Sequence, residues 1–172
     1  MAIDEKRTMF KLSHWKEPQL YKSLPFLTNE KAIKQDVKQF WFAGVHSDIG
    51  GGYPEDESGL AKIALKWMID EARESGIEFR ETMVKRLVDG KNPAKATRVY
   101  CKPDPLAEIH DSMGIAWKFV EYIPKYGRRA GANKKSLHIP RSEQRHILVD
   151  SNIHDSVKYK KENSNYDPKN LK

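Results

Sequence analysis

A run of bulky apolar residues lies within residues 37–45 and stops abruptly at a histidine. Its centre, Phe40-Trp41-Phe42-Ala43, is apolar at every position rather than at every second one. A half-buried strand alternates apolar and polar residues, whereas a strand covered on both faces is continuously apolar. The pattern therefore predicts a buried strand over residues 37–45, of the kind found in a parallel or mixed α/β sheet.

A second pattern predicts a helix over residues 59–75. Apolar residues recur there at helical spacing and form one core-facing stripe, which consists of Leu60, Ile63, Ala64, Trp67, Met68 and Ala72. We expect Ser58 to be the N-cap of this helix and Gly76 to be the glycine that ends it. Trp67 and Met68 are interpreted as packing residues.

The remaining patterns are weaker. Residues 77–88 suit a second helix, and residues 115–122 suit either a helix or a strand. Residues 4–30 are expected to be irregular, because Pro18 and Pro25 interrupt short apolar groups.

A glycine-rich loop over residues 46–58 is predicted to join the strand to the helix. Glycine reaches backbone angles that other residues avoid, so such a loop can turn sharply or approach a ligand closely. The residues expected to shape it are Asp48, Gly50, Gly51 and Gly52. A histidine at the end of a buried strand is held rigidly and still reaches a substrate, which makes His46 a candidate catalytic residue.

The net charge of +7 is unevenly distributed along the 172 residues. Residues 1–120 hold 19 Lys and Arg against 18 Asp and Glu, whereas residues 121–172 hold 12 against 6. We therefore divide the chain into an α/β part, residues 1–120, and a basic, loop-rich C-terminal region, residues 121–172. Basic segments attract nucleic acid, anionic lipid head groups or acidic proteins. Nothing has the aromatic and glycine spacing of an RNA-binding sheet or the pattern of a helix-turn-helix, so no nucleic-acid partner is expected.

The sequence also bears on the compartment. The single cysteine, Cys101, leaves no internal disulfide and fits a reducing environment. No apolar stretch approaches the length of a membrane span, and the acidic residues near the N-terminus do not suit a Sec signal peptide. We expect the protein to be cytoplasmic in the cell that makes it.

The predicted elements do not form a complete domain. A strand that is covered on both faces needs neighbouring strands on both sides, and only one such strand is predicted. Trp41, Phe42 and Trp67 likewise require a larger core than the other segments supply. The chain is therefore expected to be part of a larger domain.

The segment from Trp41 to Met68 carries a resemblance to a known family. Its block Trp41-Phe42-Ala43-Gly44-Val45-His46-Ser47-Asp48-Ile49-Gly50-Gly51-Gly52-Tyr53 resembles the α/β-hydrolase domain of Tle1-like type VI secretion phospholipase effectors and their uncharacterised relatives. The likeness extends upstream over residues 2–15 and downstream over residues 105–112, 153–157 and 166–171. Only the C-terminal portion of that domain is represented.

The resemblance implies a serine hydrolase. In the α/β-hydrolase fold the triad runs Ser, Asp or Glu, His, and the serine occupies a Gly-x-Ser-x-Gly elbow. His46 follows what would be the last core strand, where it would accept the serine proton and return it to the leaving alcohol. The sequence contains no Gly-x-Ser-x-Gly. The acid of the family also lies upstream of the segments seen here, which leaves Asp4 as the fallback.

Other interpretations of these residues stay open. Asp48 would either orient a neighbouring loop or His46, or cap the glycine turn. His46 and Asp48 are only two potential metal ligands, without a third at suitable spacing, so no metal and no cofactor is predicted. His110 and His154 each precede Asp-Ser, and we interpret both as turn or capping motifs.

Two functions follow. The first is a fragment of a lipid-ester hydrolase that carries the triad histidine, is inactive alone, and pairs with the upstream half of the domain in the same or a separate chain. Type VI delivery and an immunity protein as partner come with that resemblance, and whether this chain itself is an enzyme is left open. The second is a non-catalytic module that binds an acidic protein or an anionic membrane surface through residues 121–172. A cooperative thermal transition would exclude a third case, a chain that does not fold stably.

Overall fold

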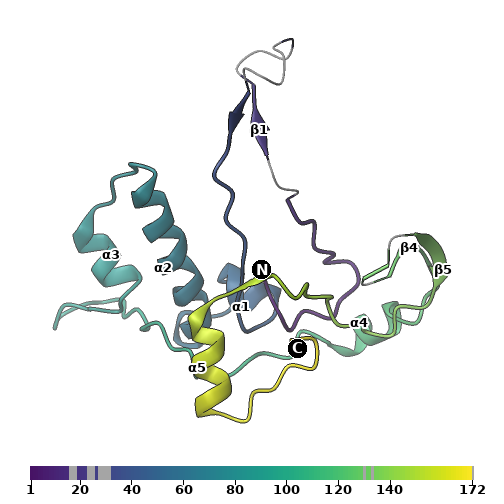
Figure 1. Cartoon of the computed structure of the whole chain (residues 1–172). Coiled ribbons are helices and arrows are strands. Elements are labelled where there is room, and N and C mark those ends of the chain that lie inside the picture. The colour runs from purple at the N-terminus through teal and green to yellow at the C-terminus, as the bar shows by residue number, and fades with distance from the viewer. Residues whose placement is uncertain (16–18, 23–25, 27–31, 130, 133, 172) are drawn as a thin grey trace.

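The computed structural model describes residues 1–15, 19–22, 26, 32–129, 131–132 and 134–171. Its helices are α1 (His46–Gly50), α2 (Gly59–Glu74), α3 (Glu81–Leu87), α4 (Ile115–Val120) and α5 (Asp155–Asn163), with a 3₁₀ turn at Glu55–Glu57. Its strands are β1 (Leu20–Tyr21), β2 (Ile33–Lys34), β3 (Phe40–Trp41), β4 (Lys125–Arg128), β5 (Lys135–His138) and β6 (Asn152–Ile153). This mixture of helices and small sheets is compatible with the expected α/β class (Figure 1).

The predicted buried strand lies at the centre of the molecule, although it is shorter than residues 37–45. β3 pairs with β6 in parallel, and on its other side Phe42 forms a parallel bridge with Ala2. Ile3 N–H donates to Phe42 O at 3.0 Å, and Asp4 N–H donates to Gly44 O at 3.1 Å. The segment from Phe40 to Gly44 thus has parallel neighbours on both sides, as a doubly covered strand requires.

Both faces of this central segment are buried, which confirms the interpretation of its continuous apolar run. Trp41 and Ala43 pack on one face with Ile3 and with Val157 of α5. Phe42 points to the opposite face, where its neighbours are Leu60, Ile63 and Ala64 of α2. Successive side chains of a strand alternate between its two faces, so α2 and α5 cover the segment from opposite sides.

The predicted helix over residues 59–75 is confirmed as α2. Ser58 occupies the N-cap position without capping, because its hydroxyl donates to the carbonyl oxygens of Tyr53 and Pro54. At the other end Gly76 has a φ of 84° and its N–H donates to Arg73 O at 2.8 Å. Ile77 N–H donates to Ala72 O at 3.0 Å. These two bonds form the Schellman motif, so the predicted role of Gly76 is confirmed.

The predicted packing role of Met68 is wrong in this structure. Trp67 contacts the Phe40 and Phe42 rings at centroid distances of 5.2 and 5.7 Å, but Met68 is 56% exposed. α2 uses its first turns against β3 and its later turns against α3, where Ile69 is buried. The face between them, with Leu65 and Met68, borders a cavity of about 410 Å³.

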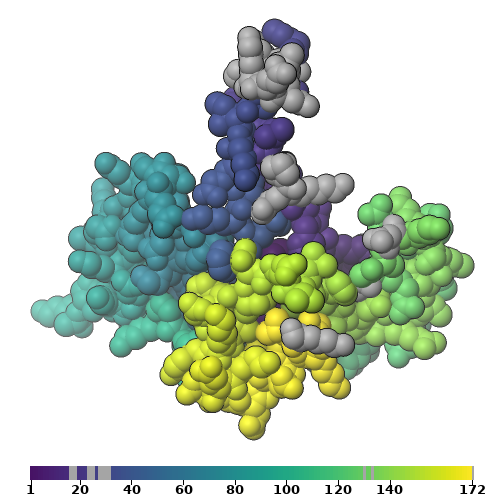
Figure 2. All heavy atoms as spheres, viewed as in Figure 1, coloured from purple at the N-terminus to yellow at the C-terminus, as the bar shows by residue number. Residues whose placement is uncertain are grey.

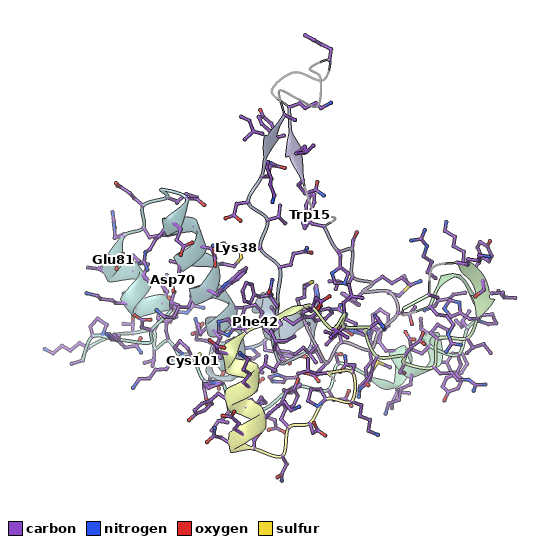
Figure 3. The ribbon with its side chains drawn as sticks, in the orientation of Figure 1. Trp15, Lys38, Phe42, Asp70, Glu81 and Cys101 are labelled. Carbon is purple, nitrogen blue, oxygen red and sulfur yellow. The ribbon has the colours of Figure 1, made fainter. Side chains whose placement is uncertain are left out.

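Segments around this core extend in three directions (Figures 1 and 2). The antiparallel pair β1–β2 projects from the body, α2 and α3 form one side, and α4 with the antiparallel hairpin β4–β5 forms the other. In Figure 3 Lys38 lies beside α2, where it pairs with Glu71 and Glu74. The weaker helix of residues 77–88 is confirmed over α3, and residues 115–122 are resolved in favour of a helix, α4.

Candidate functional site

His46 lies at the carboxyl end of the central segment, but it begins a helix rather than a loop. Val45 is the N-cap of α1, and its N–H donates to the Asp48 carboxylate at 2.8 Å. Gly51 ends the helix with a φ of 72°, a conformation that favours glycine. The prediction of a continuous loop over residues 46–58 was therefore wrong, because local hydrogen bonds turn its first residues into α1.

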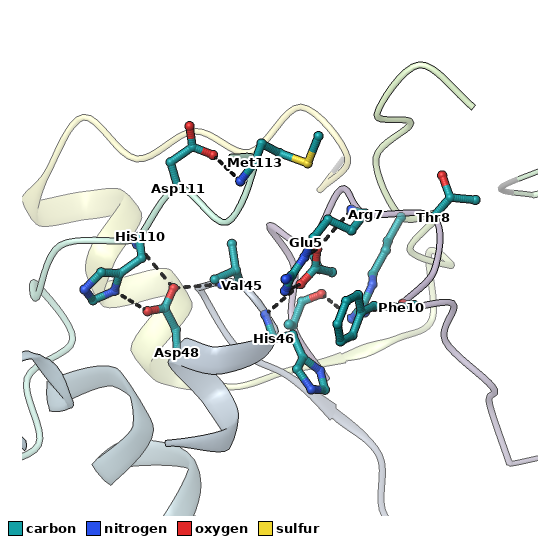
Figure 4. A network of polar contacts seen from close by, with 12 residues as sticks. Glu5, Arg7, Thr8, Phe10, Val45, His46, Asp48, His110, Asp111 and Met113 are labelled. Carbon is teal, nitrogen blue, oxygen red and sulfur yellow. Dashed lines mark hydrogen bonds and ion pairs between the residues drawn. The ribbon is translucent and has the colours of Figure 1, made fainter. Parts of the chain in front are cut away.

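The imidazole of His46 is exposed, and it packs on the Phe10 ring with centroids 4.8 Å apart. Only the backbone of His46 is tied to a carboxylate, because its N–H donates to Glu5 Oε2 at 3.1 Å. No side chain within the described residues hydrogen-bonds the ring. Figure 4 shows the ring pointing away from the Asp48–His110 pair. Both ring nitrogens are therefore open to a group from outside this set of residues.

Glu5 anchors the backbone beside His46. Its buried carboxylate accepts hydrogen bonds from Arg7 N and Nε, both at 2.9 Å, and from Arg7 Nη2 at 2.7 Å (Figure 4). Burial alone would raise the pKa of Glu5, but the hydrogen bonds from Arg7 and from His46 N–H lower it to about 2. Through its bond to His46 N–H, this ion pair anchors the first residue of α1.

The same arginine connects the site to α4. The Arg7 guanidinium lies 4.0 Å from the Phe10 ring centroid and 5.4 Å from that of Trp117 in α4. Phe10 and Trp117 meet edge to face at 5.9 Å. An arginine between two aromatic rings gains cation–π attraction from both. Phe10 therefore touches His46 on one side and α4 on the other.

Asp4, the fallback acid, lies next to the site without approaching the His46 ring. Its carboxylate accepts hydrogen bonds from Gly44 N–H at 2.7 Å and from the Tyr166 hydroxyl at 2.9 Å. Burial raises the pKa of Asp4, and these hydrogen bonds offset part of that increase. In this arrangement Asp4 holds the N-terminal segment, the central strand and the C-terminal region together. Its role as the triad acid stays a prediction that no contact here supports.

Asp48 binds a histidine that the sequence did not suggest. Its buried carboxylate contacts His110 Nδ1 at 2.6 Å, and Glu57 contacts His110 Nε2 at 3.0 Å. Tyr53 stacks on the His110 ring at a centroid distance of 3.6 Å. Burial would lower the pKa of His110, but the contacts with the two carboxylates raise it. Asp48 thus orients a neighbouring segment and the start of α1 rather than the His46 ring.

The turn interpretation of the two His-Asp-Ser motifs holds for only one of the histidines. His154 caps α5, because its Nδ1 accepts a hydrogen bond from Ser156 N–H at 3.2 Å. Asp111 accepts from Met113 N–H at 2.8 Å, as in an Asx turn. The His110 side chain is instead paired with Asp48, 62 residues away in the sequence.

The glycines around His46 differ in what they do. At Gly44 the φ is 122°, and a Cβ there would lie 2.6 Å from Asp48 Cβ, so the close approach of Asp48 requires glycine. A Cβ on Gly52 would lie 2.9 Å from Ser47 Cβ. Gly51 provides the left-handed end of α1, whereas nothing lies within 4 Å of a Cβ on Gly50. Sequence reasoning did not single out Gly44.

Comparison with known proteins now adds to this geometry. Residues 1–71 match the family described as "T6SS, Phospholipase effector Tle1-like, catalytic domain". The predicted resemblance to that family is thereby confirmed for residues 1–71, which include Asp4, His46 and Asp48. A curated relative, "Uncharacterized protein YEL023C" of Saccharomyces cerevisiae, is 40% identical over 56 residues. The match covers 31% of this chain and 8% of that protein, so the chain spans a small part of its relative. No solved structure matches.

The described residues contain neither a cluster of metal-binding side chains nor a helix able to span a membrane. No group of three or more His, Cys, Asp or Glu side chains is placed to hold a metal ion in that part of the chain. None of its helices is both long and apolar enough to cross a bilayer. The chemistry of the site therefore has to be argued from the exposed imidazole and the residues that fix its backbone.

The Asp48–His110 pair leads to a pH prediction. A group whose pKa is higher in the folded state stabilises the fold fully below its unfolded pKa, and this contribution disappears as the pH rises through the folded value. We therefore expect His110→Gln to reduce the free energy of unfolding more at about pH 5.5 than at about pH 8.5. Urea unfolding at both values measures the difference. His138→Gln is the control, because among the described residues its ring hydrogen-bonds to a backbone carbonyl and to no carboxylate. An equal loss at both pH values would contradict the prediction.

Proposed function

We propose that this chain supplies the histidine of a lipid-ester hydrolase, with His46 as the general base and acid. The observation that carries the proposal is the match of residues 1–71 to the catalytic domain of Tle1-like phospholipase effectors. The position of His46 agrees with the proposal. Its imidazole is exposed at the carboxyl end of a central parallel strand, and the triad histidine of an α/β-hydrolase occupies a similar position.

The nucleophile and the acid are proposed to come from outside these 172 residues. No Gly-x-Ser-x-Gly occurs in the sequence, and the His46 ring contacts no carboxylate among the residues that the structure describes. The exposed face of α2 around Leu65 and Met68, with its cavity of about 410 Å³, supports a missing neighbour. The upstream half of the domain, in the same or a separate chain, would supply the neighbour and the missing groups. This chain alone would then be inactive.

The other expectations of the family remain proposals too. The substrate class would be a lipid ester, the delivery route a type VI system, and an immunity protein a further partner. The C-terminal portion of an α/β-hydrolase sheet is the fold that accords with these roles. The upstream half of the domain would add the serine-bearing strands beside residues 1–4, β3 and β6.

The deciding experiment starts from the DNA that precedes the codon for Met1. We expect an upstream reading frame that encodes a Gly-x-Ser-x-Gly elbow, and we expect ester hydrolysis only when its product is joined to or mixed with this chain. Hydrolysis of a short-chain ester by this chain alone, dependent on His46, would show that the nucleophile has been misplaced. The hydrolase proposal fails if no upstream frame encodes such an elbow and if this chain, combined with any upstream product, does not hydrolyse esters.

A second candidate function is a non-catalytic interaction module, and the basic C-terminal region favours it. A groove of about 630 Å³ lies between residues 5–14 and 127–148, and its lining includes Lys11, Arg128, Arg129, Lys135 and Arg145. Such a concentration of cations attracts an acidic protein or an anionic membrane surface. This function would be supported if the chain lacks ester-hydrolase activity but still binds an acidic protein or anionic vesicles, and if that binding weakens with added salt.

A further inference from the structure

The segment from α4 through the β4–β5 hairpin, residues 115–138, exposes apolar side chains that nothing in the described structure covers. In α4, Ile115 is 89% exposed and Phe119 is 78% exposed, and they lie four residues apart on one face. The turn that follows α4 adds Tyr122 and Ile123, which are also exposed. We call residues 115–138 the α4–hairpin arm; Figure 1 shows it as a separate side of the molecule.

The hairpin adds a second exposed surface of the same character. Tyr126 and Leu137 are cross-strand partners and are 75% and 72% exposed. Arg128 and Lys135 are partners two residues further along and lie on the same face, because residues two apart in a strand share a face. A Cβ on Gly127 would meet Lys11 Nζ at 2.9 Å, so the opposite face of β4 is turned toward the N-terminal segment.

The exposed charged side chains of the arm are all positive. It holds six Lys and Arg but a single acid, Glu121, which is fully buried. The Glu121 carboxylate accepts hydrogen bonds from the N–H and the hydroxyl of Thr8. No carboxylate of the arm therefore reaches its surface. Like charges directly across a strand pair repel each other, so Arg128 opposite Lys135 is unfavourable until an anion lies near both.

We propose that the α4–hairpin arm docks this protein on an anionic phospholipid bilayer. Exposed apolar side chains interleaved with lysine and arginine suit the boundary between acyl chains and anionic head groups. Tyrosines such as Tyr122 and Tyr126 are typical of that boundary, because their rings are apolar and their hydroxyls remain hydrated. A partner that offers negative charge alone, such as a nucleic acid backbone, would satisfy the charges but would not cover Ile115 and Phe119.

The arm is also connected to the candidate catalytic residue. Trp117 of α4 contacts Phe10, and Phe10 contacts the His46 ring. Thr8 joins the same N-terminal segment to Glu121 at the end of α4. A bilayer bound to the arm would thus lie on the element next to His46. This link rests on the proposed function, since it gives the bilayer as the source of the lipid ester, whereas docking itself does not require hydrolysis.

The experiment is co-sedimentation of the full chain with vesicles. We expect tight binding to vesicles of phosphatidylglycerol and phosphatidylcholine in equal parts and weak binding to phosphatidylcholine alone. Arg128→Gln with Lys135→Gln should weaken binding about 25-fold, at about fivefold for each charge near the surface. Ile115→Ser with Phe119→Ser should weaken it about tenfold, and this loss should persist in about 0.5 M salt, where charge attraction is screened.

Matched controls use exposed residues away from the arm. Lys91→Gln with Lys95→Gln removes two exposed charges, and Val99→Ser with Val149→Ser removes two exposed apolar side chains. Both control variants should bind within about twofold of the original chain. If a control pair weakens binding as much as its counterpart in the arm, the proposed location is wrong.

Two further outcomes would overturn the proposal. Equal binding to neutral and anionic vesicles would contradict the role of charge. Unchanged binding by the Ile115 and Phe119 variant, together with equally tight binding to heparin or polyglutamate, would show that the surface recognises negative charge rather than a bilayer. His46→Ala should sediment with vesicles like the original chain. Docking without hydrolysis by the domain assembled with its upstream half would therefore refute only the proposed function, and hydrolysis by that assembly without docking would refute only this inference.

Discussion

Replacing His46 with alanine is expected to reduce ester hydrolysis by the assembled domain by about 10⁴-fold or more in kcat, with little change in KM. A triad histidine takes the proton from the nucleophile and returns it to the leaving group, so its removal affects the transition state far more than substrate binding. The measurement is steady-state hydrolysis of a short-chain ester by this chain combined with the upstream half of the domain.

Two controls separate catalysis from folding in that experiment. The His46 side chain is exposed and makes no hydrogen bond to another described side chain, so its loss should leave the free energy of unfolding nearly unchanged. His138→Ala removes another imidazole, one that hydrogen-bonds to a backbone carbonyl, and should retain full activity. A loss of less than about tenfold for His46→Ala would mean that His46 is not the general base.

Phe10, which contacts the His46 ring, is expected to affect hydrolysis less strongly than His46 itself. The Phe10 ring supports the imidazole from one side, and Arg7 and Trp117 hold that ring in turn. A residue that only positions the histidine affects the reaction through geometry. Such effects are smaller than removal of the base, because the chemistry remains and only its alignment suffers. Arg7 and Trp117 would thus matter for hydrolysis without touching the substrate.

The elements with a strong periodic pattern were predictable from the sequence. The continuous apolar run over residues 40–43 indicated burial on both faces, and Gly76 indicated the end of α2, where it has a left-handed conformation. The interactions of Gly76 are local, whereas the strand is covered by distant residues such as Ile3 and Val157, and only its need for cover on both faces was visible in the sequence. Burial of Met68 could not be judged in this way, because helical spacing gives a face but not what covers it.

The residues around the site were harder to predict because their partners are distant in sequence. Asp48 finds His110 62 positions away, and Glu5 finds the backbone of His46 41 positions away. Neither pairing produces a pattern among neighbouring residues that could be recognised in the sequence. The start of α1 depends on one hydrogen bond from Val45 N–H to Asp48, which competes with the flexibility of the glycines that follow. A sequence rich in glycine therefore suggested a loop where the structure has a helical turn.

The buried ion pair beside His46 should control the stability of the site. The side chains of Glu5 and Arg7 are 0% and 10% exposed, so Glu5→Ala leaves a nearly buried guanidinium without its carboxylate and His46 N–H without an acceptor. Removing one partner of a buried pair typically costs about 3–5 kcal/mol. We expect the free energy of unfolding to fall by that amount in urea titrations at neutral pH. Glu81→Ala, which breaks an exposed pair with Arg73, should cost less than about 1 kcal/mol.

The same carboxylate predicts how acid destabilises the protein. The pKa of Glu5 is lowered to about 2 in the folded state, so its contribution is complete above the unfolded value of about 4.5 and is lost as the pH falls toward 2. The difference in unfolding free energy between the original chain and Glu5→Ala should therefore shrink progressively between about pH 4.5 and pH 2. Titrations across that range measure it. A difference that stays constant would mean that Glu5 acts through packing rather than through its charge, and the Arg7–Glu5–His46 network would then not hold the histidine in place.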